Sequence, residues 1–171
     1  MPDNISDNIV KQITGTNENL FAILDSFDEN HLNTVPYANS WTAAQVGNHL
    51  TKSDRFITQL VSGPTVSTER AADEYVKQLA DTFLNFDEKL VAPEMIIPDE
   101  KTFTKAEVLT DIKSTRSNLL NVANSVDLTR TTSLKSPFGK STLLELLHFH
   151  LYHTKRHIHQ LEKIRAAVSI A

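Results

Sequence analysis

The chain has 171 residues, 40% of them hydrophobic and 22% charged, which is typical of one globular domain spanning residues 1–171 with a stable core. It has no cysteine, which excludes disulfides and thiolate metal sites, so a transition-metal site would need His, Asp or Glu ligands. The net charge is −4, and Lys and Arg are spread along the chain; both facts argue against a nucleic-acid partner and leave a small-molecule substrate open.

The N-terminal stretch MPDNISDNIV has neither the basic nor the apolar part of a signal peptide. No apolar run approaches the roughly 20 residues needed to span a bilayer. We therefore expect a cytoplasmic protein that does not enter a membrane.

Helical spacing of apolar residues predicts four long helices, over about residues 4–29, 42–61, 104–126 and 142–168. The last three open with a capping box, a Thr followed three positions later by Gln or Glu, at Thr42, Thr104 and Thr142. The expected core positions of the first helix are Ile5, Ile9, Ile13, Leu20, Ile23, Leu24 and Phe27.

The segment between the second and third long helices predicts one additional helix, over 68–90, with Tyr75, Leu79 and Phe83 on one face. The stretch APEMIIPDEK, which contains two prolines, is predicted to be an extended connection. Together these elements predict an all-α fold, an antiparallel four-helix bundle with an extra helical excursion.

Five of the seven histidines lie within residues 148–160, HFHLYHTKRHIHQ. At 100° per residue, His150 and His157 lie within about 60° of His153, on the apolar stripe of the last helix. His148 and His159 lie more than about 100° away and are expected at the surface.

Spacing separates the three inward histidines. His153 and His157 are i,i+4 neighbours and can reach one metal ion. His150 can pair with His153 instead, but it lies two turns from His157 and is too far to share an ion with it.

Of the remaining histidines, His49 also lies on an apolar stripe, whereas His31 follows the first helix in a polar turn. This pattern favours a site of His49, His153 and His157, with His150 and Gln160 beside it or in the pocket rather than bound to the ion. Three neutral ligands leave a coordination position free, as in catalytic sites, and imidazole suits Zn, Ni, Co or Fe(II). A polar core network of histidines without an ion is the alternative.

Two segments resemble the DinB/YfiT-like superfamily, SWTAAQVGNHL around His49 and HTKRHIHQL around His153 and His157. The resemblance extends over nearly the whole chain. It implies a bacillithiol transferase-like four-helix bundle, usually a homodimer, that holds nickel, zinc or another divalent ion such as manganese through those three histidines.

Relatives in that superfamily transfer low-molecular-weight thiols such as bacillithiol, isomerise maleylpyruvate with mycothiol, or are described as metal-dependent hydrolases. By this analogy we expect a metal-dependent S-transferase that joins a thiol cosubstrate to a small electrophile. A hydrolase, or a non-catalytic metal- or ligand-binding stress protein, is the alternative. No general base can be identified, since Asp54 lies about 140° from His49 on its helix. Trp41, just before the second long helix, is expected to pack in the core or as the hydrophobic staple of that helix.

Overall fold

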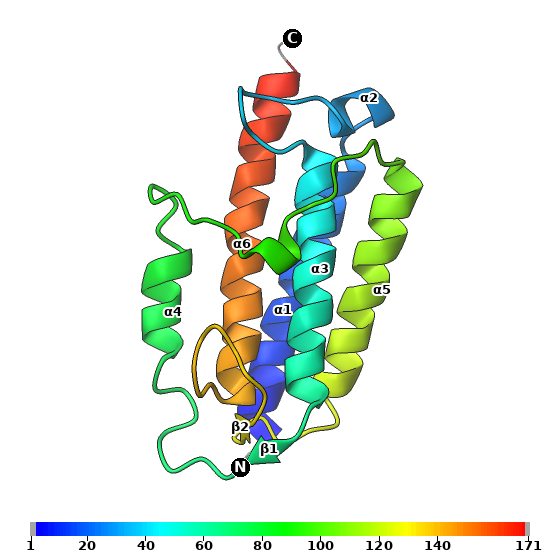
Figure 1. Ribbon diagram of the computed structural model, residues 1–171. Helices are drawn as coiled ribbons and strands as arrows, with labels where there is room; N and C mark the ends of the chain where they lie inside the picture. Colours follow the sequence, from blue (N-terminus) through cyan, green and yellow to red (C-terminus); the bar gives the residue numbers. More distant parts are fainter. Residues whose placement is uncertain (1–2, 170–171) are drawn as a thin grey trace.

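Four long helices form a bundle, shown in Figure 1: α1 (Asp3–Asp25), α3 (Ala43–Ser62), α5 (Lys105–Ala123) and α6 (Leu143–Val168). The computed structural model describes the backbone of residues 3–169 and the side chains of residues 6–169. Helices α1 and α6 run in one direction and α3 and α5 in the other. Because α3 packs against both α5 and α6, and α1 against the same two, each helix has one parallel and one antiparallel neighbour. The predicted all-α bundle is confirmed.

The capping boxes define the starts of two of these helices. Thr42 Oγ1 accepts from the backbone N–H of Gln45 at 3.1 Å, and the Gln45 side chain accepts from the backbone N–H of Thr42 at 3.0 Å. Thr142 and Glu145 form the same reciprocal pair at the start of α6. At the start of α5 only the threonine bond forms, because the Glu107 carboxylate binds Lys101 Nζ at 2.6 Å instead.

The first predicted helix is too long. Helix α1 ends at Asp25, and a short helix, α2 (Glu29–Leu32), follows it. Asp28 is the N-cap of α2, where its carboxylate accepts from the backbone N–H of His31 at 2.8 Å. An Asp side chain that caps a new helix competes with continuation of the old one, which explains the break.

The excursion between α3 and α5 is less helical than predicted, with only α4 (Val76–Phe83) forming an α-helix there. The residues before α4 are held by the buried Glu145 carboxylate, which accepts from Arg70 Nη1 at 2.6 Å and from the backbone N–H of Tyr75 at 2.9 Å. These long-range bonds fix a loop against the start of α6, where a local helix would otherwise form.

Three further short elements lie in the connections. Strand β1 (Thr65–Val66) pairs antiparallel with β2 (Thr131–Thr132) at the lower end of the bundle in Figure 1. The segment predicted to be extended contains a 3₁₀ turn, η1 (Glu94–Ile96), that packs against α3. That prediction was wrong for these three residues, and the turn contributes a backbone group to the site described below.

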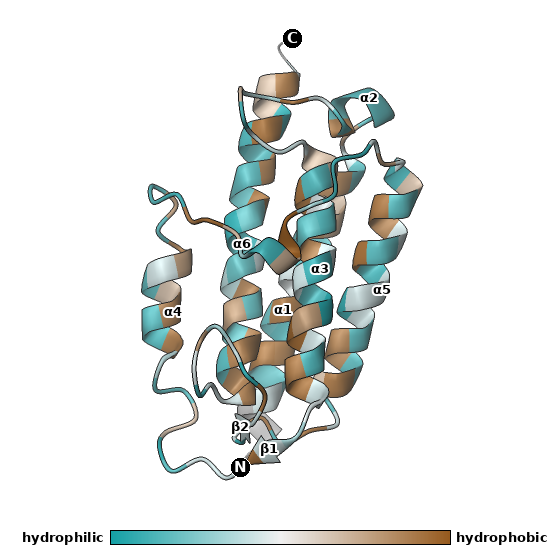
Figure 2. Ribbon diagram, viewed as in Figure 1, coloured by the Kyte–Doolittle hydropathy of each residue, from teal (hydrophilic) through white to brown (hydrophobic). Residues whose placement is uncertain are grey.

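The core lies between the four long helices, and hydrophobic residues recur along each of them in Figure 2. The predicted α1 positions Ile9, Ile13, Leu20, Ile23, Leu24 and Phe27 are all buried, while the Ile5 side chain lies outside the described residues. Among the described residues, no helix is both long and apolar enough to cross a membrane.

Candidate metal centre

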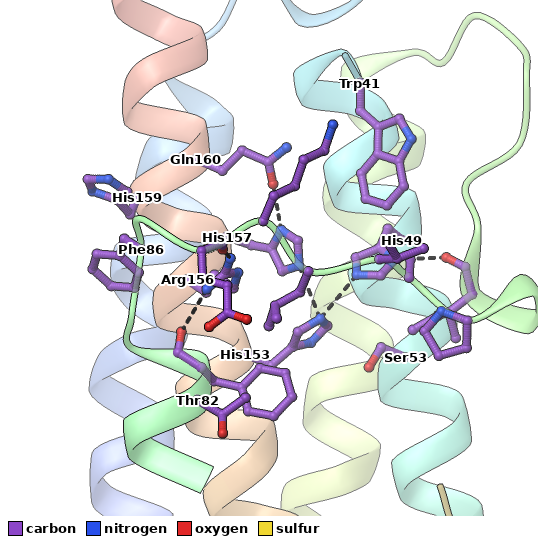
Figure 3. A pocket seen from close by; sticks show the side chains of 18 of the residues that line it. Trp41, His49, Ser53, Thr82, Phe86, His153, Arg156, His157, His159 and Gln160 are labelled. Carbon is purple, nitrogen blue, oxygen red and sulfur yellow. Dashed lines mark hydrogen bonds between the residues drawn. The ribbon is translucent and has the colours of Figure 1, made fainter. Parts of the chain in front are cut away.

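Three histidine side chains from two helices point toward one another, as Figure 3 shows. His153 Nε2 lies 3.1 Å from His49 Nε2 and 3.0 Å from His157 Nε2. All three residues are buried, with 1–7% of their surface exposed. His49 comes from α3 and the other two from successive turns of α6, so the i,i+4 spacing and the packing of α3 on α6 together create the cluster.

The outer ring nitrogens of two of these histidines are fixed by neighbouring acceptors. His49 Nδ1 donates to the backbone carbonyl of Ile96 in η1 at 2.7 Å, and His157 Nδ1 donates to Gln160 Oε1 at 2.7 Å. With the proton on Nδ1, each ring presents the Nε2 lone pair to the cluster. Both rings are therefore oriented as metal ligands.

This arrangement fits a cation better than a network of neutral histidines. The Nε2 atoms of His49 and His157 are both acceptors, and a proton on His153 Nε2 can be donated fully to only one of them. A cation at the centre satisfies all three lone pairs. Nitrogens bound tetrahedrally to zinc at 2.0–2.1 Å would lie about 3.3 Å apart, close to the two distances from His153 Nε2.

The electrostatic setting also keeps the three rings neutral, which is the form that binds metals. Burial lowers the pKa of His49 and lowers the pKa of His153 well below its ordinary value. Burial, together with the neighbouring His49, lowers the pKa of His157 to about 3. The cluster is thus uncharged at neutral pH without a bound ion.

The three histidines lie at the wall of a cavity of about 790 Å³ between α3, α6 and the segment running from α4 to η1. Arg156 of α6 holds that segment, because its guanidinium donates to the backbone carbonyls of Phe83, Asn85 and Glu88. Burial lowers the pKa of Arg156, partly offset by the charge of Glu88. The cavity wall is therefore tied to the helix that carries two of the histidines.

Aromatic rings enclose the cluster on two sides. The Trp41 ring lies 4.9 Å from the His49 ring, and the Phe149 ring stacks on His153 at 5.1 Å between centroids. Trp41 packs at the edge of the core, as predicted, and also lines the cavity. An apolar surround of this kind excludes water and strengthens electrostatic interactions at a bound ion.

The structure also corrects several expectations for the other histidines. His159 is half-buried and its ring stacks on Phe86 at 4.5 Å between centroids. His148 is half-buried too, with a buried Nδ1 that has no hydrogen-bond partner among the described residues, so both are only partly at the surface. His31 lies in α2, away from the cluster, and pairs with Asp28 at 2.7 Å.

His150 and Asp54 belong to a buried polar network next to the metal centre. His150 Nε2 bonds Asp54 Oδ1 at 3.0 Å, and Arg116 of α5 binds the same carboxylate at 3.1 Å, which lowers the pKa of Asp54 despite its burial. Asp54 is buried although it lies about 140° from His49 around the helix, because α3 packs against α5 on one face and α6 on another. Neither Asp54 nor His150 lines the cavity, whereas Gln160 does.

The fold and this site define a class of protein, a helical bundle with a three-histidine centre that could hold a divalent metal ion. A comparison with family models matches the DinB superfamily over residues 12–161, and the chain belongs to that superfamily. Comparisons with curated proteins and with solved structures gave no match.

Proposed function

We propose that this protein is a metal-dependent enzyme that transfers a low-molecular-weight thiol to a small electrophile. The observation that supports a catalytic role is the position of the histidines, whose free Nε2 atoms meet at the wall of a cavity of about 790 Å³. Among the described residues, the metal-binding group consists of these three side chains alone. A fourth coordination position would then be available to a substrate.

A bound divalent ion would supply the Lewis acidity that deprotonates a thiol at neutral pH. The chain's own groups prepare that step. Ile96 and Gln160 fix the rings of His49 and His157. The rings of Trp41 and Phe149 cover those of His49 and His153. In the reaction the thiol releases its proton to solvent, the sulfur forms a bond to the electrophilic carbon, and the leaving group departs with the electron pair of the broken bond.

The preference for a thiol over water comes from the superfamily, and the cavity supports a small-molecule substrate of either kind. Water bound in the same position would make the protein a hydrolase. The two activities require the same histidines and differ in the second reactant, so one assay can separate them.

The first measurement is elemental analysis of tag-free protein purified without chelators, for which we expect close to one nickel or zinc ion per chain. The metal-loaded protein is then mixed with 1-chloro-2,4-dinitrobenzene and one thiol at a time. The thiols tested are bacillithiol, mycothiol, coenzyme A and cysteine. We expect faster thioether formation with at least one thiol, and none above background in the His153→Ala variant. Hydrolysis of ester or amide substrates without thiol conjugation would support the hydrolase, and metal binding without either reaction would support a non-catalytic role.

A further inference from the structure

The three histidines divide the cavity into two chemically different ends. Along α6 the lining runs from Phe149 to Lys163, a stretch of fifteen residues that rises by about 21 Å. His153 and His157 lie in the middle of that length. A molecule bound at the histidines can therefore extend toward either end of the cavity.

Aromatic side chains line the end toward the N-terminus of α6. This aromatic end consists of Phe56, Phe83, Phe138 and Phe149, which belong to one hydrophobic cluster. The Phe149 ring lies 4.9 Å from Phe83 and 4.3 Å from Phe138. Such a surface suits a flat or apolar body more than a charged one.

Hydrogen-bond donors line the end toward the C-terminus of α6. This donor end consists of Gln160 and Lys163, which are i,i+3 neighbours on the helix and both line the cavity. Gln160 Oε1 is used by His157, and its amide N–H groups have no acceptor among the described residues. Lys163 is exposed and has no carboxylate within salt-bridge distance in the described part of the chain. Its backbone carbonyl accepts from Tyr37 Oη at 3.3 Å.

Two carboxylates also line the cavity, Asp87 and Glu88, and both lie on the segment held by Arg156. Burial lowers the pKa of Arg156, and the negative charge of Glu88 partly offsets this effect. No carboxylate among the described residues pairs with Lys163, and a free amide donor of Gln160 lies one turn away, a combination that binds a carboxylate.

We propose that the donor end binds a carboxylate of the thiol cosubstrate and that the aromatic end binds the apolar body of the electrophile. The sulfur and the electrophilic carbon then meet at the histidines, between the two ends. From His157 to Lys163 is six residues, or about 9 Å of helix, so the cosubstrate carries its carboxylate at about that distance from the sulfur. The assignment of the donor end rests on the proposed thiol transfer, and it names Lys163 and Phe138 as specificity-determining residues.

The test for the donor end compares two thiols of equal length, 6-mercaptohexanoate and 6-mercapto-1-hexanol, on the zinc-loaded protein. Trp41 is the only tryptophan and lines the cavity, so its fluorescence reports binding without any reaction. We expect the carboxylate to bind about tenfold more tightly, as for one charge-assisted interaction. Lys163→Met should remove this preference, whereas Lys11→Met, at an exposed position on α1, should keep it.

The outcomes separate this inference from the proposed function. If both thiols bind the unmodified protein equally well, or if Lys163→Met keeps the preference, the assignment of the donor end is overturned while thiol binding stands. If neither thiol binds, the thiol-transfer proposal fails together with the donor end.

The aromatic end is tested on metal-free protein with 4-nitrobenzyl alcohol, an unreactive aromatic quencher of tryptophan fluorescence. Phe138→Leu keeps an apolar side chain but removes the ring, and we expect it to weaken binding about fivefold. The same variant, loaded with zinc, should bind 6-mercaptohexanoate as the unmodified protein does. Unchanged binding of the nitroaromatic, or equal weakening of both probes, would contradict the division of the cavity into two ends.

Discussion

At the residue scale, His153 holds the central position in the candidate metal centre. Its Nε2 lies within 3.1 Å of the Nε2 atoms of both other histidines, whereas His150, one turn earlier on α6, bonds Asp54 in the adjoining network. Two buried histidines three residues apart thus have different partners. The reason is that the Asp54 carboxylate, which does not line the cavity, binds the Nε2 of His150.

This difference gives a first prediction. His153→Ala should abolish metal binding, because it removes the ligand that lies between the other two, whereas His150→Ala should largely preserve it. Metal per chain is measured by elemental analysis after loading with zinc or nickel and desalting, with folding checked by circular dichroism. The opposite pattern, with metal lost from the His150 variant and kept by the His153 variant, would show that the ligand set is wrong.

At the scale of elements, the glutamate of the capping-box motif makes different contacts in α5 and in α6. Glu145 closes the capping box of α6, is 1% exposed, and also binds Arg70 and the backbone of Tyr75. Glu107 occupies the same motif position in α5, but its side chain is exposed and contacts Lys101. The motif predicts where each helix begins, and the surroundings decide how much the carboxylate stabilises.

We therefore predict unequal effects of removing these two carboxylates. Glu145→Ala should lower the free energy of unfolding by about 2 kcal/mol or more, because it leaves Arg70 and the Tyr75 N–H without their acceptor. Glu107→Ala should cost less than about 1 kcal/mol, as for an exposed ion pair. Urea unfolding at pH 7.5 measures both, and equal losses would mean that the loop before α4 is not held by Glu145.

Much of the helical framework could be predicted from the sequence, and much of the connections could not. The starts of α3, α5 and α6 follow from Thr42, Thr104 and Thr142, and the buried positions of α1 follow from helical spacing. The loop before α4 depends on Glu145, seventy residues away along the chain, and no local pattern announces such a contact. The break after Asp25 does have a local signal in the sequence, because Asp28 is a typical N-cap residue for the short helix that follows.

At the scale of the whole molecule, the site combines groups that sequence patterns reveal with groups that only the fold brings together. Helical spacing selected His49, His153 and His157, and the structure brings their Nε2 atoms together. The Ile96 carbonyl that orients His49 is a backbone group in the connection between α4 and α5. Of the cavity's aromatic residues, Phe83 is the last residue of α4 and Phe86 follows it. Side-chain periodicity carries no information about a carbonyl, so these parts of the site required the three-dimensional structure.

The buried cluster also ties the stability of the metal-free protein to pH. The pKa of His157 is about 3 in the folded protein, against an ordinary value of 6.5, so the unfolded chain binds a proton between these values and the folded chain does not. Stability is therefore complete above pH 6.5 and falls as the pH drops below it. Between pH 7.5 and 5.0 this one histidine should cost about 2 kcal/mol of unfolding free energy.

The comparison that isolates this effect is between the metal-free protein and its His157→Gln variant, because glutamine does not titrate. Urea unfolding at pH 7.5 and pH 5.0 should show a loss with acid that is about 2 kcal/mol smaller in the variant. Equal losses in the two proteins would mean that His157 takes up a proton in the folded state near its ordinary pKa. In that event burial would not keep the three rings neutral in weak acid. A metal ion would then have to displace protons from the rings in order to bind there.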